Sequence, residues 1–304
     1  MTKPVIGFVG IGLMGHGVCL NILKAGFPLV VVAHRNRAPV EDLVGRGATE
    51  ALSVAELASA CDIIHICVTG SPQVEAVIGG DDGIAANARA GSVVVDCSTS
   101  DPVSTARLAE TLAERGISMA DAPLGGTPAN AAAGTLGALV GADDDTFARI
   151  EPVISAWSRN IMHLGPVGTG HKMKLINNFM SLGNAALLSE AMAIARKSGL
   201  TVEQFDRVIG TSRMHNGFYD TFMKWTLERD DTAHRFTITN AHKDMRYLSC
   251  LAIGSGALNP LQDIVRNQLS AMESAGSGAQ FVPMIADFIA SANGLNSEVP
   301  NDKK

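Results

Sequence analysis

The sequence predicts an α/β fold, in which a doubly wound parallel sheet is followed by an all-helical region. Short β-branched runs alternate with helical patterns through the first half of the chain. A glycine-rich turn follows the first of these runs, and after about residue 165 only helical patterns remain. Alternating strands and helices are typical of a parallel sheet covered on both faces, and the later helices indicate a second domain.

Six apolar runs are expected to form the strands. They lie at residues 5–9, 29–33, 62–68, 92–96, 117–122 and 135–141. Their nearly continuous apolar character is typical of strands buried on both faces. Between them, Ser53 with Glu56 and Asp101 with Pro102 indicate helix starts, because the first residue of each pair can cap the backbone N–H groups of the first turn.

The second half is predicted to be helical throughout. Helices are expected from about residue 168, from the Thr201/Gln204 capping box, near 214–228 and 238–254, from Asn259-Pro260, and near 280–292. The first of these is long and is expected to join two domains, at residues 1–164 and 165–304. Residues 296–304 are expected to be a frayed tail.

Composition excludes several functional classes. The 304-residue chain is 46% apolar and carries a net charge of -6 without a dense basic run, which argues against a nucleic-acid partner. No uninterrupted apolar stretch is long enough for a membrane span or matches a secretory signal. Histidines are scattered without metal-ligand spacing, so no metal is expected. The five cysteines form no C-x-x-C motif and are expected to be reduced, as in a cytoplasmic protein.

Gly10, Gly12 and Gly15 form a G-x-G-x-x-G turn, with Leu13 and Met14 inside it, between the first predicted strand and a helix. Such a turn brings a backbone free of side chains, and the N–H groups of a helix start, close to a pyrophosphate. The motif alone could also be a tight turn without a ligand. Its place at the first strand–helix junction favours a Rossmann-type dinucleotide-binding domain.

About 20 residues later, domains that bind NAD carry an acidic residue for the ribose hydroxyl. Here the chain instead reads Ala33, His34, Arg35, Asn36 and Arg37. Arginine binds phosphate with two hydrogen bonds, so the missing acid and the two guanidinium groups favour NADP, with NAD possible as well. The alternative is a pair of solvated loop arginines.

The predicted helix from residue 168 carries a polar stripe at i, i+3, i+4 and i+7, formed by Lys174, Asn177, Asn178 and Ser181. A buried lysine is costly unless it is paired or neutral, and adjacent asparagines oppose helix propensity. Lys174 is therefore a candidate acid/base whose pKa burial would lower, and Asn178 could donate its amide N–H to a substrate oxygen. The alternative is that the stripe is the solvent face of an amphipathic helix.

Four motifs, in this order, resemble the β-hydroxyacid dehydrogenase family, which includes 3-hydroxyisobutyrate dehydrogenase and tartronate semialdehyde reductase. They cover a cofactor fingerprint, a substrate loop, a catalytic motif and a late Lys-Asp segment. The matching segments are "GFVGIGLMG" (7–15), "DAPLGGTPANAAAGTL" (121–136), "GPVGTGHKMKLINN" (165–178) and "FTITNAHKDM" (236–245). The resemblance extends over nearly the whole chain.

The resemblance implies hydride transfer between nicotinamide and a short β-hydroxy acid or its semialdehyde, a small anionic substrate. It implies that Lys174 is the catalytic acid/base and that Asn178, also in the catalytic motif, helps to hold the substrate. The implied substrate contacts are Gly125, Gly126, Thr127 and Asn177, and the implied further cofactor contacts are Val68, Thr69, Thr99 and Lys243. Members of the family form dimers or tetramers, so a homodimer or homotetramer is expected.

The substrate loop departs from the usual D-A-P-V-S-G-G pattern. Gly125 replaces the serine and Thr127 replaces the second glycine, so a hydroxyl lies two residues later. Thr69 and Gly70 replace a common Pro-Asn pair. The loop resembles that of the semialdehyde and sulfolactaldehyde reductases, but Gly126 stands where that branch often has an arginine, so a sulfonate substrate is only weakly supported.

Two other functions are compatible with the sequence. The first is an imine reductase on the same scaffold, although such relatives usually lack the lysine found here at position 174. The second function is a non-catalytic NADP-binding sensor module, which would give no reason for the Lys174/Asn178 pair.

For Lys243, an ion pair with Asp244 is the alternative to cofactor contact.

Overall fold

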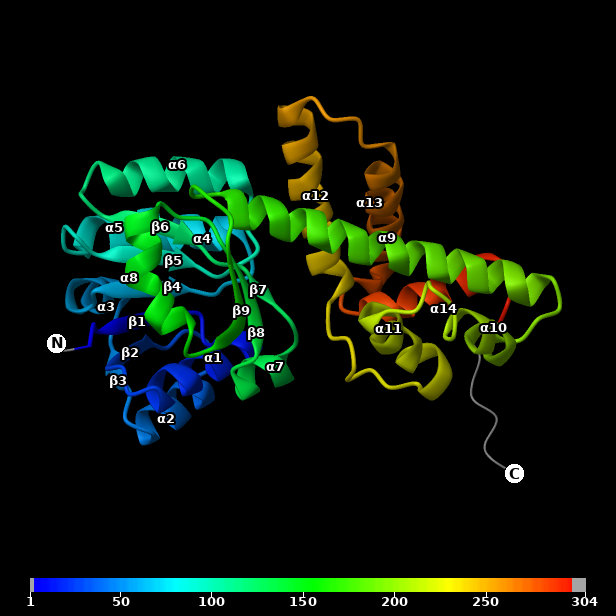
Figure 1. Cartoon of the computed structure of the whole chain (residues 1–304), viewed down its shortest axis with the longest axis horizontal. Coiled ribbons are helices and arrows are strands. Elements are labelled where there is room, and N and C mark those ends of the chain that lie inside the picture. The colour runs from blue at the N-terminus through cyan, green and yellow to red at the C-terminus, as the bar shows by residue number, and fades with distance from the viewer. Residues whose placement is uncertain (1–2, 297–304) are drawn as a thin grey trace. The chain divides into compact units, whose positions relative to one another are not determined.

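The computed structural model describes residues 3–296, so the predicted tail lies outside the described residues except for Asn296. The chain divides into two compact units, Met1–Leu175 and Ile176–Lys304. The division falls inside α9 (Thr169–Lys197), a 29-residue helix that is the long helix expected from residue 168 (Figure 1).

The first unit contains a six-stranded parallel sheet with strand order β3-β2-β1-β4-β5-β6. Its strands are β1 (Ile6–Val9), β2 (Leu29–Val32), β3 (Thr49–Ala51), β4 (Ile63–Ile66), β5 (Val93–Asp96) and β6 (Ser118–Asp121). This is the order of a doubly wound dinucleotide-binding fold, in which the direction of strand addition reverses between β1 and β4. The predicted fold class is confirmed.

Helices cover both faces of this sheet. One apolar cluster joins Phe8 of β1 to residues of α1 (Leu13–Lys24), α2 (Ala38–Gly45) and α8 (Asp144–Ile154). The other joins Ile66 of β4 to residues of α3 (Val54–Ala60), α4 (Ser71–Gly79), α5 (Ile84–Asn87) and α6 (Pro102–Ala113). Full burial of each large apolar side chain contributes roughly 1.5–3 kcal/mol. The continuous apolar runs in the sequence reflect this burial on both faces.

Both predicted N-caps are present, although Ser53 and Glu56 do not complete a capping box, because Glu56 Oε2 accepts from the N–H of Leu52 and not from that of Ser53. The Ser53 side chain accepts a hydrogen bond from the backbone N–H of Glu56 at 3.1 Å and starts α3. The Asp101 carboxylate accepts from the N–H of Val103 at 3.0 Å and starts α6. These local signals placed both helix starts correctly.

A second, three-stranded sheet contains β7 (Leu124–Gly125), β8 (Leu136–Val140) and β9 (Ser158–His163). The run predicted at 135–141 therefore forms a strand, but in this smaller sheet and not beside the other five. The sequence contains no apolar signal for β9, because its exposed residues include the successive polar side chains of Arg159 and Asn160. Between β7 and β8 lies the short helix α7 (Pro128–Ala133).

The second unit consists of the rest of α9 and further helices: α10 (Val202–Ile209), α11 (Gly217–Glu228), α12 (Ile238–Ser255), α13 (Pro260–Met272) and α14 (Ile285–Ala292). The Thr201/Gln204 capping box is complete, with both reciprocal hydrogen bonds. An isolated antiparallel bridge pairs Thr237 with Phe281. Among the described residues, no helix combines the length and apolar character that a membrane crossing requires.

Candidate active site

The glycine turn after β1 has the backbone that a dinucleotide requires. Gly10 adopts φ +98°, and a Cβ there would collide with the carbonyl of Cys67 in the loop after β4. A Cβ at Gly12 would meet no atom within 4 Å, so the surface beside this glycine is open. At Gly15, a Cβ would collide with the carbonyl of Gly10. Gly10 thus makes the turn, Gly12 leaves room for a ligand, and Gly15 allows the helix to pack closely.

The segment after β2 exposes His34, Arg35 and Asn36. Arg37 also belongs to it, but its guanidinium lies 3.0 Å from Glu50 Oε1 and forms a second, longer ion pair with Glu41. Within residues 3–296, Arg35 has no ion pair. Arg35 is thus the guanidinium of this segment without an ion pair, whereas Arg37 would have to exchange its carboxylate partners for a ligand.

The loops after β4 and β5 are bonded to each other. The N–H of Val68 donates to Ser98 Oγ at 2.9 Å, and the N–H of Asp101 donates to Ser71 Oγ at 2.7 Å. Thr69 is exposed and Thr99 is half-buried. Both loops lie at the carboxyl ends of their strands, where open α/β sheets bind ligands.

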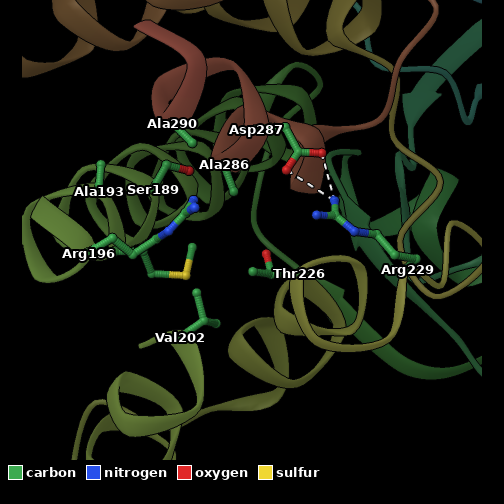
Figure 2. A pocket seen from close by; sticks show the side chains of 10 residues that line it. Ser189, Ala193, Arg196, Val202, Thr226, Arg229, Ala286, Asp287 and Ala290 are labelled. Carbon is green, nitrogen blue, oxygen red and sulfur yellow. Dashed lines mark hydrogen bonds and ion pairs between the residues drawn. The ribbon is translucent and has the colours of Figure 1, made fainter. Parts of the chain in front are cut away.

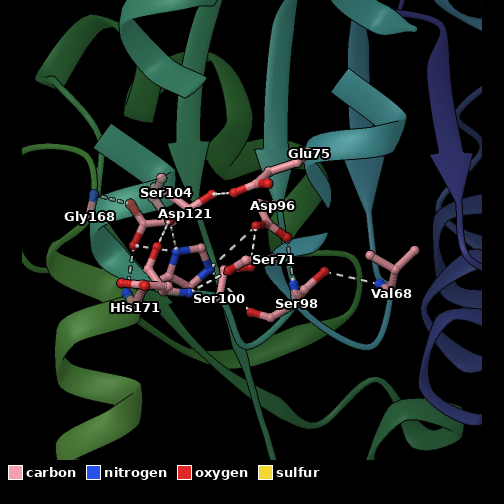
Figure 3. A network of polar contacts seen from close by, with 12 residues as sticks. Val68, Ser71, Glu75, Asp96, Ser98, Ser100, Ser104, Asp121, Gly168 and His171 are labelled. Carbon is pink, nitrogen blue, oxygen red and sulfur yellow. Dashed lines mark hydrogen bonds and ion pairs between the residues drawn. The ribbon is translucent and has the colours of Figure 1, made fainter. Parts of the chain in front are cut away.

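Two buried carboxylates end the neighbouring strands β5 and β6, where Asp96 pairs in register with Asp121 (Figure 3). Asp96 accepts from the N–H of Ser98 at 2.8 Å and from Ser100 Oγ at 2.7 Å. Asp121 accepts from the backbone N–H groups at the start of α9, at 2.5 Å from Gly168 and at 2.6 Å from residue 171. Burial raises the pKa of the Asp121 carboxyl, and these two donors oppose that shift.

Lys174 lies on the second turn of α9 and is half-buried. Its Nζ donates a hydrogen bond to the carbonyl oxygen of Leu124 at 2.7 Å. Leu124 directly precedes the predicted substrate residues Gly125, Gly126 and Thr127. The structure thus brings the candidate acid/base to the first residue of the candidate substrate loop.

The candidate substrate loop leads into α7, which packs directly on α1. A Cβ at Gly17 of α1 would lie 2.7 Å from the carbonyl carbon of Ala131, and Asn21 Nδ2 donates to the Ala131 carbonyl at 2.9 Å. Thr127 caps α7, and its hydroxyl donates to Asn130 Oδ1 at 2.7 Å. The hydroxyl expected to contact the substrate therefore already has its proton engaged in the helix cap.

In the second unit, a buried carboxylate gathers two of the predicted residues. Asn178 Nδ2 donates to Asp244 Oδ2 at 2.7 Å, and Lys243 Nζ lies 3.0 Å from Asp244 Oδ1. The ion pair considered for Lys243 is thus present. Asn177 is exposed, and its carbonyl accepts from Ser181 Oγ at 3.2 Å. Within the polar stripe, Asn178 is therefore buried and Lys174 half-buried, each with a specific partner, whereas Asn177 faces solvent.

A small pocket in the second unit is too small for a substrate. Figure 2 shows its lining, in which Arg229 pairs with Asp287 at 2.8 Å. The Thr226 hydroxyl is buried there without a hydrogen-bond partner among residues 3–296. The free volume of about 10 Å³ is room for roughly one water molecule.

Asp96, Asp121 and His171 received no role from the sequence. The sequence does carry a signal for the two aspartates, because each lies at or near the end of a predicted buried strand. The carboxyl ends of such strands form the edge of the sheet that binds ligands. His171 has no comparable local signal, since its partners are 66 and 73 residues away in the chain.

Family models match most of the chain. Residues 5–165 match the NAD binding domain of 6-phosphogluconate dehydrogenase, and residues 168–286 match the NAD-binding region of NADP-dependent 3-hydroxyisobutyrate dehydrogenase. This chain belongs to the β-hydroxyacid dehydrogenase family. As a β-hydroxyacid dehydrogenase it is an NAD(P)-dependent oxidoreductase, as the sequence motifs predicted.

Individual relatives agree with this family. The chain is 35% identical to 2-(hydroxymethyl)glutarate dehydrogenase from Eubacterium barkeri, with 81% of each chain covered. It is 30% identical to 3-sulfolactaldehyde reductase from Escherichia coli, with 97% of this chain and 98% of that relative covered. The structure of a 3-hydroxyisobutyrate dehydrogenase from Salmonella typhimurium superposes with a TM-score of 0.83 at 26% identity, covering 93% and 99% of the two chains.

Proposed function

We propose that this β-hydroxyacid dehydrogenase interconverts a short β-hydroxy acid and its semialdehyde, with Lys174 as the acid/base. The observation that carries the proposal is the hydrogen bond from Lys174 Nζ to the carbonyl of Leu124, at the start of the glycine-rich loop. Nicotinamide, when bound, would supply or accept the hydride at the carbon that bears the oxygen. Lys174 gives a proton to that oxygen during reduction and takes it back during oxidation.

The surrounding residues hold the amine and the substrate. The Leu124 carbonyl orients the ammonium, because it accepts one of the three ammonium protons. We assign substrate contact to Gly125, Gly126, Thr127, Asn177 and Asn178. Because the proton of the Thr127 hydroxyl is engaged with Asn130, its oxygen can act on the substrate only as an acceptor unless the cap opens.

Asn178 is held in one orientation by Asp244. An amide has two N–H donors, and one of them is directed at the Asp244 carboxylate. The second N–H is left for a substrate oxygen, as the sequence suggested. Asp244 also pairs with Lys243, and we propose that Lys243 contacts the cofactor together with Val68, Thr69 and Thr99.

The purified protein is expected to oxidise NADPH when it is given short aldehydes that carry a carboxylate. The measurement is the loss of absorbance of the reduced cofactor over a panel of carboxylated, sulfonated and uncharged aldehydes, with cyclic imines included. Turnover of carboxylated aldehydes would support the proposal. Cofactor binding without turnover of any compound would indicate a sensor module, and turnover restricted to imines would indicate an imine reductase.

We propose NADP as the preferred cofactor, with the 2′-phosphate held by Arg35 near His34 and Asn36. Replacing Arg35 by serine removes the exposed guanidinium and is expected to lower the ratio of kcat/KM for NADPH to that for NADH about 10- to 100-fold, because a charge-assisted contact contributes roughly 1.5–3 kcal/mol. Arg37→Ser is the matched control, since Arg37 is paired with Glu50, and it should change the ratio less than about threefold. Equal ratios in both variants and the wild type would refute the assignment.

We further propose that a face of α9 contacts a second copy of the chain, in a homodimer or homotetramer. Met180, Leu187 and Ile194 recur at seven-residue spacing and expose 63%, 57% and 66% of their surface. This spacing places them on one helix face. Sedimentation of the protein at micromolar concentration tests this, and a Leu187→Glu variant should shift the distribution towards monomer.

The remaining proposals concern the cellular compartment of the protein and the roles of its two domains. All five cysteines are free, as is usual for proteins of a reducing compartment. We therefore propose the cytoplasm. We also propose that residues 1–164 form the cofactor domain and that residues 165–304 form the substrate and oligomerisation domain.

A further inference from the structure

His171 lies between the two carboxylates at the end of the sheet and is fully buried. Its Nε2 is 3.7 Å from Asp96 Oδ2, and its Nδ1 is 3.8 Å from Asp121 Oδ2. Closer contacts go to neutral groups: Nε2 lies 3.2 Å from the carbonyl oxygen of Ser98, and Nδ1 lies 2.8 Å from Thr105 Oγ1 (Figure 3). The two ring nitrogens of His171 therefore have different partners, a backbone carbonyl at Nε2 and a hydroxyl at Nδ1.

The contact with Ser98 fixes which nitrogen carries hydrogen. A carbonyl oxygen can only accept, so Nε2 must be the donor. The imidazole therefore donates a hydrogen bond from the first turn of α9 to the loop after β5. Because Ser98 Oγ in turn accepts from the N–H of Val68, the same link extends to the loop after β4.

These connections join the helix of the candidate acid/base to both loops assigned to the cofactor. Lys174 is three residues beyond His171 on α9, while Thr99 follows Ser98 and Thr69 follows Val68. Buried hydrogen-bond networks whose members are all satisfied hold their elements in one arrangement. All of these residues belong to the first compact unit.

We propose that His171 is a positioning residue, which sets the place of the Lys174 amine relative to the two loops assigned to the cofactor through its Nε2 hydrogen bond to Ser98. This proposal rests on the function proposed for Lys174. Transfer of hydride and proton requires reacting atoms about 3–3.5 Å apart, so a displacement of about 1 Å can cost on the order of 100-fold in rate. The helix itself is also held by Asp121, so losing the imidazole link should shift α9 without releasing it.

Two amide variants separate the two ends of the ring. The amide of His171→Gln can occupy the place of Nε2 and keep the donor to Ser98, whereas the shorter amide of His171→Asn matches Nδ1 and keeps only the contact with Thr105. We expect His171→Asn to lower kcat roughly 10- to 100-fold and to raise the primary isotope effect with deuterated NADPH, with cofactor Kd nearly unchanged. His171→Gln should stay within about threefold of wild type. Equal kcat losses in the two variants, or no loss in either, would overturn the proposal.

A second pair of variants covers the case in which His171→Asn does not fold. Ser98→Ala keeps the backbone carbonyl that accepts from Nε2 but removes the hydroxyl through which the link continues to Val68, and Thr105→Val removes the partner of Nδ1; both side chains are almost fully buried. We expect Ser98→Ala to lower kcat about 10-fold with a raised isotope effect, and Thr105→Val to keep kcat within about threefold. Equal kcat in the two would contradict the proposal. If Lys174→Ala itself kept full activity, the proposed function would fail first, and the two failures would be distinguished.

Discussion

Replacing Lys174 by alanine is expected to lower kcat by about 10²–10⁴-fold, because that is the usual contribution of a positioned acid/base. The loss should appear in kcat and in kcat/KM alike, since the amine acts on a proton that moves in the transition state. The carbonyl of Leu124 loses a hydrogen-bond donor in this variant, but the amine is half-buried, so the fold is expected to persist. Steady-state rates and circular dichroism of the same preparation measure both effects.

Lys172 provides the matched control on the same helix. Its side chain is exposed and two residues from Lys174, so Lys172→Ala removes the same charge from α9 without touching the candidate site. It should change kcat by less than about twofold, as surface substitutions generally do little. A Lys174→Ala variant with near-normal turnover on a good substrate would remove the chemical basis of the proposed function.

The parallel sheet could be predicted because its strands are buried on both faces and therefore read as apolar runs. β3, with the sequence Thr-Glu-Ala, lies at the edge of the sheet and buries only Ala51, so it lacks that signal. β9 is also missing from the prediction, because it pairs through its backbone while half of its side chains face solvent. Strands held by hydrogen bonds more than by burial leave little trace in composition.

The candidate site was predictable where the local rules of the helix are broken. A lysine and two asparagines along an apolar helix drew attention to Lys174 and Asn178, and both have specific partners in the structure. Their partners could not be predicted, because Leu124 offers a backbone carbonyl and Asp244 is 66 residues away from Asn178. Side-chain chemistry can be read from sequence, whereas a backbone acceptor is specified only by the fold.

One buried polar residue lies outside the site and affects the fold itself. His65 is in the middle of β4, in register with Phe8 of β1, and their rings stack at 5.8 Å. It is fully buried, and neither ring nitrogen has a hydrogen-bond partner within residues 3–296. Burial therefore lowers the pKa of His65 from 6.5 to about 3.

This pKa predicts that acid destabilises the fold. Above pH 6.5 the imidazole is neutral in both the folded and the unfolded chain, so its titration does not affect stability. Below pH 6.5 the unfolded chain binds a proton that the folded chain refuses until about pH 3, and the free energy of unfolding decreases. At about 1.4 kcal/mol per pH unit, His65 should lower this free energy by about 4 kcal/mol between pH 6.5 and 3.5.

Urea unfolding of His65→Leu beside wild type isolates this effect. The leucine cannot titrate, so the difference in unfolding free energy between variant and wild type should move in the variant's favour by about 3 kcal/mol from pH 7 to pH 4. His34→Leu, at an exposed histidine, is the control and should show a shift below about 0.5 kcal/mol. Since packing changes at position 65 affect both pH values equally, they cancel in this difference. A constant difference across the pH range would mean that the imidazole is protonated, or reached by solvent, inside the folded sheet.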